Sequence, residues 1–108
     1  MNYGLTEQQL AAIRTILGRI PSIESASIFG SRALGTFSPA SDVDIALMGE
    51  TVSLREQLQL CSMLNEIDAL LQFDVVRCAS ITNRKLLEHI QKYGREIYRK
   101  DSIEEKVA

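Results

Sequence analysis

The chain has 108 residues, of which 45% are hydrophobic and 24% charged, and this balance indicates one folded, soluble globular domain spanning residues 1–108. Its formal net charge of -2 argues against a dedicated binder of long nucleic acid, which normally carries a clustered basic surface. The N-terminal segment lacks the basic and apolar regions of a leader, and no apolar run approaches the roughly 20 residues that cross a bilayer. We therefore expect a cytoplasmic protein with no membrane partner.

The first predicted element is a helix that begins at the capping box Thr6–Gln9. One apolar stripe follows at three- and four-residue spacing, formed by Leu10, Ile13, Leu17 and Ile20. Pro21 is expected to end this segment, because proline cannot continue a helix.

A short strand is predicted at residues 26–29, followed directly by a glycine-bounded turn and short helix at Gly30–Gly35. This junction resembles a strand-to-helix phosphate loop. Gly30 would allow the backbone to approach a phosphate closely, and Ser31 offers a hydroxyl and an amide. Arg32 could add a cationic contact to a bound nucleotide.

The next strand, predicted at residues 42–47, alternates between apolar and acidic side chains. One face, formed by Val43, Ile45 and Leu47, is expected to enter the core. The opposite face carries Asp42, Asp44 and Ala46.

Two further helices and a third strand complete the predicted elements. A second capping box, Ser53–Glu56, begins a long amphipathic helix. Residues 73–76 read as a strand with Phe73 and Val75 on one face and Asp74 on the other. A last helix is expected to start near Asn83 and to be disturbed at Gly94. Its apolar stripe comprises Leu86, Ile90, Tyr93 and Ile97.

Asp42 and Asp44 lie two residues apart on one strand, which places their Cβ atoms roughly 7 Å apart on one face. Asp74 could join them from a neighbouring strand. Three carboxylates on one open face repel one another unless a cation neutralises them, and Mg²⁺ prefers such oxygen ligands together with substrate phosphates. We therefore expect Asp42 and Asp44 to bind the metal that carries a triphosphate, in a site that accommodates two ions. Asp74 would help to hold the catalytic ion or accept the proton of an attacking hydroxyl.

These residues carry a family resemblance. Gly30-Ser31, ten intervening residues and then Asp42-Val43-Asp44 resembles the Gly-Ser-x10-Asp-x-Asp signature of the DNA polymerase beta-like nucleotidyltransferases. The stretch from Phe29 to Ile45 is especially similar to the minimal nucleotidyltransferases called MNT, and Asp74 matches their third acidic position. Residues 86–98 are similar to their C-terminal helix.

The resemblance implies an α/β fold of the α+β kind, with a small mixed sheet of three to five strands, helices packed on one face and a palm-like shape. It also implies Mg²⁺ as the cofactor, ATP as the nucleotide donor and a HEPN-type toxin as the partner. In that family the MNT member is an antitoxin that transfers AMP to a hydroxyl, typically of a tyrosine, on the HEPN protein.

Alternative functions remain open from the sequence. The chain could be a non-enzymatic antitoxin module that masks a partner with a vestigial nucleotide site, or it could transfer a nucleotide to a small molecule. Homo- or hetero-oligomers are compatible with so small a domain. His89 has no predicted acidic neighbour and is expected to have a surface or packing role, and Cys61 and Cys78 are expected to be small buried apolar residues.

Overall fold

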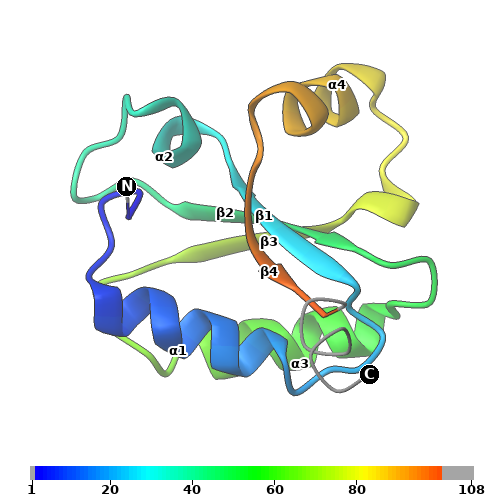
Figure 1. Ribbon diagram of the computed structural model, residues 1–108, viewed down its shortest axis with the longest axis horizontal. Helices are drawn as coiled ribbons and strands as arrows, with labels where there is room; N and C mark the ends of the chain where they lie inside the picture. Colours follow the sequence, from blue (N-terminus) through cyan, green and yellow to red (C-terminus); the bar gives the residue numbers. More distant parts are fainter. Residues whose placement is uncertain (1, 101–108) are drawn as a thin grey trace.

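The computed structural model describes residues 2–100, so residues 1 and 101–108 of the expected domain lie outside the described range. Its elements follow one another along the chain (Figure 1) in the order α1 (Glu7–Leu17), β1 (Ser25–Phe29), α2 (Ser31–Leu34), β2 (Val43–Met48), α3 (Leu54–Leu64), β3 (Phe73–Arg77), the 3-10 helix η1 (Cys78–Ser80), α4 (Arg84–Tyr93) and β4 (Arg95–Arg99). Within residues 2–100, no helix is long and apolar enough to cross a membrane.

The strands form one mixed sheet in the order β3-β2-β1-β4, which confirms the predicted α/β fold with three to five strands. β1 is antiparallel to both β2 and β4, whereas β2 and β3 are parallel. A parallel pair needs a crossover connection, and α3 supplies it between β2 and β3.

Both capping boxes form as predicted. The Thr6 hydroxyl accepts a hydrogen bond from the Gln9 amide at 3.0 Å, and the Gln9 side chain accepts one from the Thr6 amide at 2.9 Å. Ser53 and Glu56 make the same reciprocal pair at the start of α3. These bonds satisfy amides at the start of each helix that have no acceptor within the helix, so the two helix starts are set by local sequence.

The end of α1 was predicted wrongly. The helix stops at Leu17 and is capped by Gly18, so Pro21 lies in the segment beyond it. Tighter turns follow, in which the Ile20 amide donates to the Leu17 carbonyl at 3.3 Å. Ile20 nevertheless remains buried, because the turns keep its side chain on the apolar stripe.

The main hydrophobic core lies between the sheet and the helices α1 and α3, which cover one face (Figure 1). Val43, Ile45 and Leu47 are almost wholly buried in it, as the alternation of β2 predicted. Leu60 and Leu64 of α3 contribute from the helix side. The main core therefore fixes the facing of β2, since a slip by one residue would drive its acidic side chains inward.

The predicted helix layer on one face consists of α1 and α3, while α2 and α4 lie on the opposite side of the sheet (Figure 1). On that side Phe29, Ala46 and Ile90 form a second, smaller core. Ala46 is therefore buried although it shares a strand face with Asp44. The acidic face of the sheet is open at its acidic positions and covered at Ala46.

The predicted C-terminal helix over residues 86–98 is wrong beyond Tyr93. α4 begins after Asn83, near the expected start, and the Asn83 side chain caps it, but Gly94 ends the helix and Arg95–Arg99 forms the edge strand β4. β4 pairs with β1, which would otherwise have unpaired backbone groups along that edge. Ile97, expected on the helix stripe, is instead buried in the main core.

Candidate active site

Asp44 and Asp74 meet because of the strand register. β2 and β3 run parallel with Asp44 opposite Asp74, and residues opposite one another in a sheet share a face. That face is opposite the main core, because Ile45 and Val75, their next residues, are both buried in the main core. Asp42 precedes the start of β2 and lies two residues before Asp44. The sheet thus places Asp44 and Asp74 on one face, and Asp42 lies near enough to act electrostatically on Asp44.

Asp44 occupies the electrostatic centre of this group. It is half-buried, whereas Asp42 and Asp74 are exposed. Burial raises the pKa of Asp44, and repulsion from the Asp74 and Asp42 carboxylates raises it further, while Arg32 and His89 act in the opposite direction. An ionised Asp44 is therefore destabilised until a cation compensates it.

These residues fit a divalent metal by their donor type. The described residues contain no ready-made cluster of three or more His, Cys, Asp or Glu side chains able to enclose an ion. Mg²⁺ commonly takes one or two carboxylates from the protein and its other ligands from water and substrate phosphates. Carboxylate oxygens at Asp42, Asp44 and Asp74, with a raised pKa at the central one, match that requirement.

Gly30 packs directly against the Asp44 carboxylate. Its backbone has φ 73° and ψ -152°, a conformation that is essentially restricted to glycine. A Cβ at this position would run into Oδ2 of Asp44 and would lie 3.2 Å from its Cγ. Glycine is therefore required by the Asp44 contact as well as by the backbone, a reason that the sequence did not indicate.

Ser31 opens α2 immediately after Gly30, at the predicted strand-to-helix junction. The first amides of a helix have no acceptor within the helix and point outward from its start. Gly35 ends the short helix in the left-handed conformation, with φ 82°. The junction therefore places Ser31 directly after Gly30, the residue that packs against Asp44.

Arg32 does not have the free side chain expected of a nucleotide contact. It is 1% exposed, and its Nε and Nη2 donate to the Ser41 carbonyl at 3.2 and 2.8 Å. Its Nη1 donates to the Tyr3 carbonyl at 2.9 Å, and the guanidinium lies over the Phe37 ring at 5.4 Å from the centroid. Arg32 thus joins the N-terminal segment to the loop before β2, and its charge reaches Asp44 only through space.

His89 belongs to the site although sequence reasoning gave it only a surface or packing role. Its Nε2 accepts a hydrogen bond from the Gly30 amide at 3.2 Å, a bond that only the neutral imidazole can make, whereas protonation of the ring would lower the pKa of Asp44. The imidazole makes an edge contact with Phe29 and a tilted contact with Tyr93, with ring centroids 6.2 and 5.3 Å apart. His89 and Gly30 are 59 residues apart, so no local pattern could have indicated their contact.

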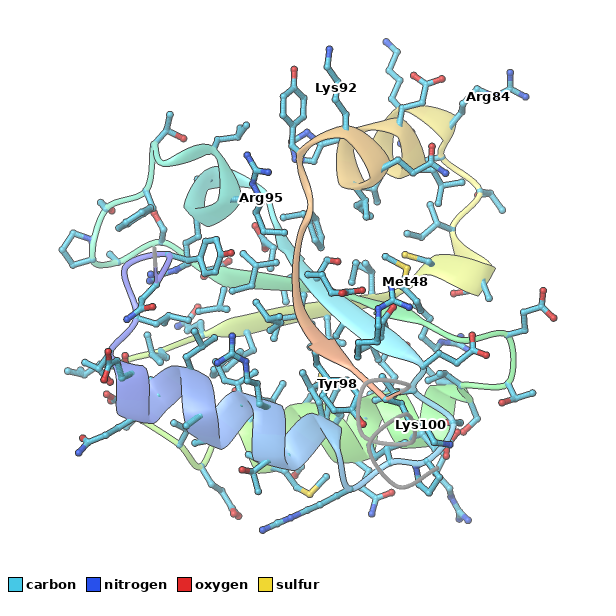
Figure 2. All side chains as sticks on the ribbon, viewed as in Figure 1. Met48, Arg84, Lys92, Arg95, Tyr98 and Lys100 are labelled. Carbon is cyan, nitrogen blue, oxygen red and sulfur yellow. The ribbon has the colours of Figure 1, made fainter. Side chains whose placement is uncertain are left out.

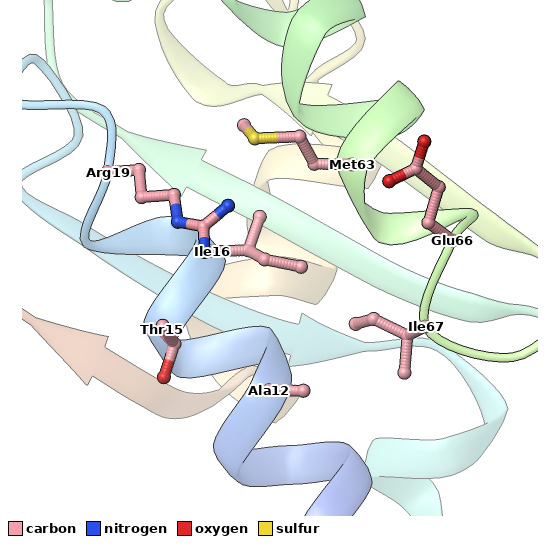
Figure 3. A pocket seen from close by; sticks show the side chains of 7 residues that line it. All are labelled: Ala12, Thr15, Ile16, Arg19, Met63, Glu66 and Ile67. Atoms are coloured by element: carbon pink, nitrogen blue, oxygen red, sulfur yellow. The ribbon is translucent and has the colours of Figure 1, made fainter.

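Two hollows beside α1, lined also by α3 or by the segment that follows it, lie on the other face of the sheet. One has a volume of about 300 Å³ (Figure 3) and is lined by Ala12, Thr15, Ile16, Arg19, Met63, Glu66 and Ile67. The other, about 470 Å³, shares Ala12 and Ile67 with it. The sheet separates both hollows from Asp42, Asp44 and Asp74, so neither is part of the acidic site.

Comparison with known proteins agrees with this geometry. Residues 11–103 match the family described as polymerase beta, nucleotidyltransferase. No protein among those with curated functions matches. Three similar solved structures share the fold. A toxin-antitoxin with AMP-PNP is 25% identical with a TM-score of 0.70, over 89% of this chain and 77% of that chain, and the toxin-antitoxin MntA-HepT is 21% identical with a TM-score of 0.66, over 93% of this chain and 78% of that chain. A tri-AMPylated Shewanella oneidensis HEPN toxin in complex with MNT antitoxin is 22% identical with a TM-score of 0.64, over 90% of this chain and 75% of that chain. The chain therefore belongs to the polymerase beta-type nucleotidyltransferase family.

Proposed function

We propose that the protein is a Mg²⁺-dependent adenylyltransferase that transfers AMP from ATP to a hydroxyl of a HEPN-type partner, acting as the antitoxin of the pair. The observation that carries the proposal is Asp44, half-buried between two other carboxylates and packed on Gly30 at the strand-to-helix junction. Family membership supports nucleotidyl transfer in general.

Asp42 and Asp44 would hold the metal with the triphosphate, and Asp74 would complete the set from β3. When bound, Mg²⁺ would neutralise these carboxylates and the charge that develops on the reacting phosphates. Ser31 would orient the phosphates from the start of α2 through its hydroxyl and amide. Most of the rate enhancement would come from positioning and charge stabilisation.

In the transfer step, the acceptor hydroxyl oxygen forms a bond to the α-phosphorus. The bond from that phosphorus to the oxygen bridging to the β-phosphate breaks, and pyrophosphate leaves with the electron pair. The hydroxyl proton passes to the exposed Asp74 carboxylate or to solvent.

The choice of a protein acceptor rests on the similar solved structures. One is a toxin-antitoxin with AMP-PNP, an ATP analogue, and another contains a HEPN toxin that carries AMP groups beside its MNT antitoxin. A HEPN-type protein, ATP and transfer of AMP are therefore the partner, donor and reaction that we assign to this chain. A tyrosine is the hydroxyl expected from the family resemblance.

The test is transfer of label from α-phosphate-labelled ATP to a HEPN-type protein from a gene adjacent to the gene of this chain, in the presence of Mg²⁺. The Asp42→Asn/Asp44→Asn variant should lose transfer by at least about 100-fold. Glu66→Gln is the matched control, since it removes one exposed carboxylate on the opposite face and should leave transfer unchanged.

Equal labelling of the partner protein by the wild type and the double variant would contradict the proposal. A wild type that binds and silences the partner, without Mg²⁺-dependent ATP binding, would favour a non-enzymatic masking module. Labelling of a small molecule in place of the protein would indicate that the chain transfers nucleotides to small molecules.

A further inference from the structure

We propose that His89 is a positioning residue of nucleotidyl transfer, which holds the Gly30 peptide and, through it, Asp44 and the start of α2. The inference rests on the proposed function and adds a residue that lies outside the Gly-Ser and Asp-x-Asp motifs. Its basis is the hydrogen bond from the Gly30 amide to Nε2 of His89, at 3.2 Å.

The Gly30 amide needs this acceptor. The paired register of β1 with β2 ends at Phe29, so Gly30 lies just beyond the ladder. Glycine has the widest backbone freedom of any residue, and without a tie the Gly30 peptide could rotate. A half-buried amide without a partner also loses the free energy of its hydrogen bond to water. His89 thus removes a freedom that the sheet does not control.

The position of the Gly30 peptide matters because two site elements depend on it. The Asp44 carboxylate lies against the Cα of Gly30, closely enough that a Cβ would collide with Oδ2. Ser31, the next residue, opens α2. The Gly30 amide belongs to the peptide that joins Phe29 to Gly30, so a rotation of that peptide would change φ of Gly30 and with it the Asp44 contact. Ser31 follows across the next peptide, whose Gly30 carbonyl accepts from the Leu34 amide at 3.1 Å.

His89 is itself firmly supported. Phe29 contacts its ring edge from β1 and Tyr93 contacts it from the next turn of α4. The neighbouring Ile90 anchors α4 in the second core. Arg84 and Lys92 of the same helix extend away from the sheet (Figure 2), whereas the hydrogen bond to Gly30 places His89 on the side of α4 that faces the end of β1. A rigid support of this kind is what precise positioning requires.

A positioning role, as opposed to direct catalysis, follows from the nitrogen involved. Nε2 accepts the Gly30 amide proton, so this nitrogen carries no proton of its own and its lone pair is already used. The nitrogen therefore cannot take a proton from the acceptor hydroxyl while the contact exists. His89 acts on the reaction through Gly30.

Two substitutions distinguish the role of the hydrogen-bond acceptor of His89 from the role of its aromatic ring. His89→Phe keeps an aromatic ring between Phe29 and Tyr93 but removes the acceptor, whereas His89→Gln keeps an acceptor at similar reach and removes the ring. We expect His89→Phe to lower kcat about 10- to 100-fold, the usual effect of losing an outer-shell partner, and His89→Gln to restore most of it. The KM for the partner protein should be unchanged in both variants, since neither substitution alters the surface that contacts that protein. His89→Leu replaces His89→Phe if the latter does not fold.

Hydrogen exchange of the Gly30 amide, measured by NMR without nucleotide, provides a readout independent of activity. The amide should be protected in the wild type and in His89→Gln, and should exchange at least about tenfold faster in His89→Phe. Wild-type kcat in His89→Phe, equal losses in both variants, or unchanged exchange would overturn the inference. A wild type that transfers no nucleotide would instead overturn the proposed function, so the two failures are distinguishable.

Discussion

Replacing Gly30 by alanine tests the contact on which the site depends. Two costs are expected. The backbone at φ 73° and ψ -152° is strained for a residue with a Cβ, at about 1–3 kcal/mol. The Cβ also collides with the Asp44 carboxylate, and overpacking of this kind typically costs about 1–3 kcal/mol. Gly30→Ala should therefore lower the free energy of unfolding by about 2–6 kcal/mol.

Gly35→Ala is the matched control, because this glycine also has a positive φ, 82°, but a Cβ there would meet nothing within 4 Å. Only the backbone cost remains, about 1–2 kcal/mol. The collision can be isolated further with Asp44→Ala, since the nearest atom to the added Cβ would then be the Cβ of residue 44, at 3.6 Å. In that background Gly30→Ala should cost only its backbone strain.

The assay is urea unfolding of the four single and double variants, followed by circular dichroism, with thermal melts in parallel. The coupling between Gly30→Ala and Asp44→Ala should be at least about 1 kcal/mol. In melting temperature, each kcal/mol corresponds to roughly 4–8 °C for a domain of this size. A Gly30→Ala cost equal to that of Gly35→Ala, with no coupling to residue 44, would refute the close packing of Gly30 on Asp44.

Three further substitutions or reactions follow from the same structure. Because burial and neighbouring carboxylates raise the pKa of Asp44 in the folded state, its ionisation destabilises the fold above that pKa and the penalty is relieved as pH falls through it. Asp44→Asn should therefore raise the free energy of unfolding at neutral pH, by no more than about 1 kcal/mol because the carboxylate is still partly in contact with water. Urea titrations should show that this gain becomes smaller at acidic pH. A gain that grows toward acidic pH would contradict the reasoning. Arg32→Met should lower the free energy of unfolding, measured in urea, by about 2–4 kcal/mol, because the Ser41 carbonyl and the other acceptor of the buried guanidinium lose their donor. An unchanged free energy of unfolding would show that the guanidinium hydrogen bonds are dispensable. Burial raises the pKa of the Cys61 and Cys78 thiols, so iodoacetamide should alkylate both more slowly in the native protein than in urea at the same pH, and equal rates would exclude that protection.

The parts of the fold that were predictable are those specified by neighbouring residues. The capping boxes at Thr6 and Ser53 set the two long helix starts, because the side chains that satisfy the first amides lie three residues away. The alternation of β2 set its facing, because one side had to enter the core. Asp44 and Asp74 could be placed on one face for the same reason.

β4 could not be predicted, because its strand identity depends on a distant partner. The apolar spacing through Ile90 and Ile97 continues across Gly94 and favours a helix when read alone. The exposed edge of β1 pairs with residues 95–99 instead, and the pairing supplies backbone hydrogen bonds that local spacing does not reveal. Tertiary pairing therefore outweighed local propensity at the C-terminal end of the described chain.

The roles of Arg32 and His89 were hidden for a related reason. Arg32 follows the phosphate-loop signature, and only the fold shows that its guanidinium turns inward to backbone carbonyls. His89 reaches Gly30 across 59 residues because α4 returns over the sheet beside the end of β1. Residue type and spacing indicated which acids could act together, but side-chain direction and long-range contacts required the structure.

The most direct test of the metal and nucleotide site is calorimetric titration of a non-hydrolysable ATP analogue with and without Mg²⁺. The wild type should bind the analogue with Mg²⁺ and at least about tenfold more weakly with a chelator present, and Asp42→Asn/Asp44→Asn should bind weakly in both conditions. Equal affinity with and without Mg²⁺, or undiminished binding by the double variant, would contradict the assignment of these carboxylates as the metal ligands.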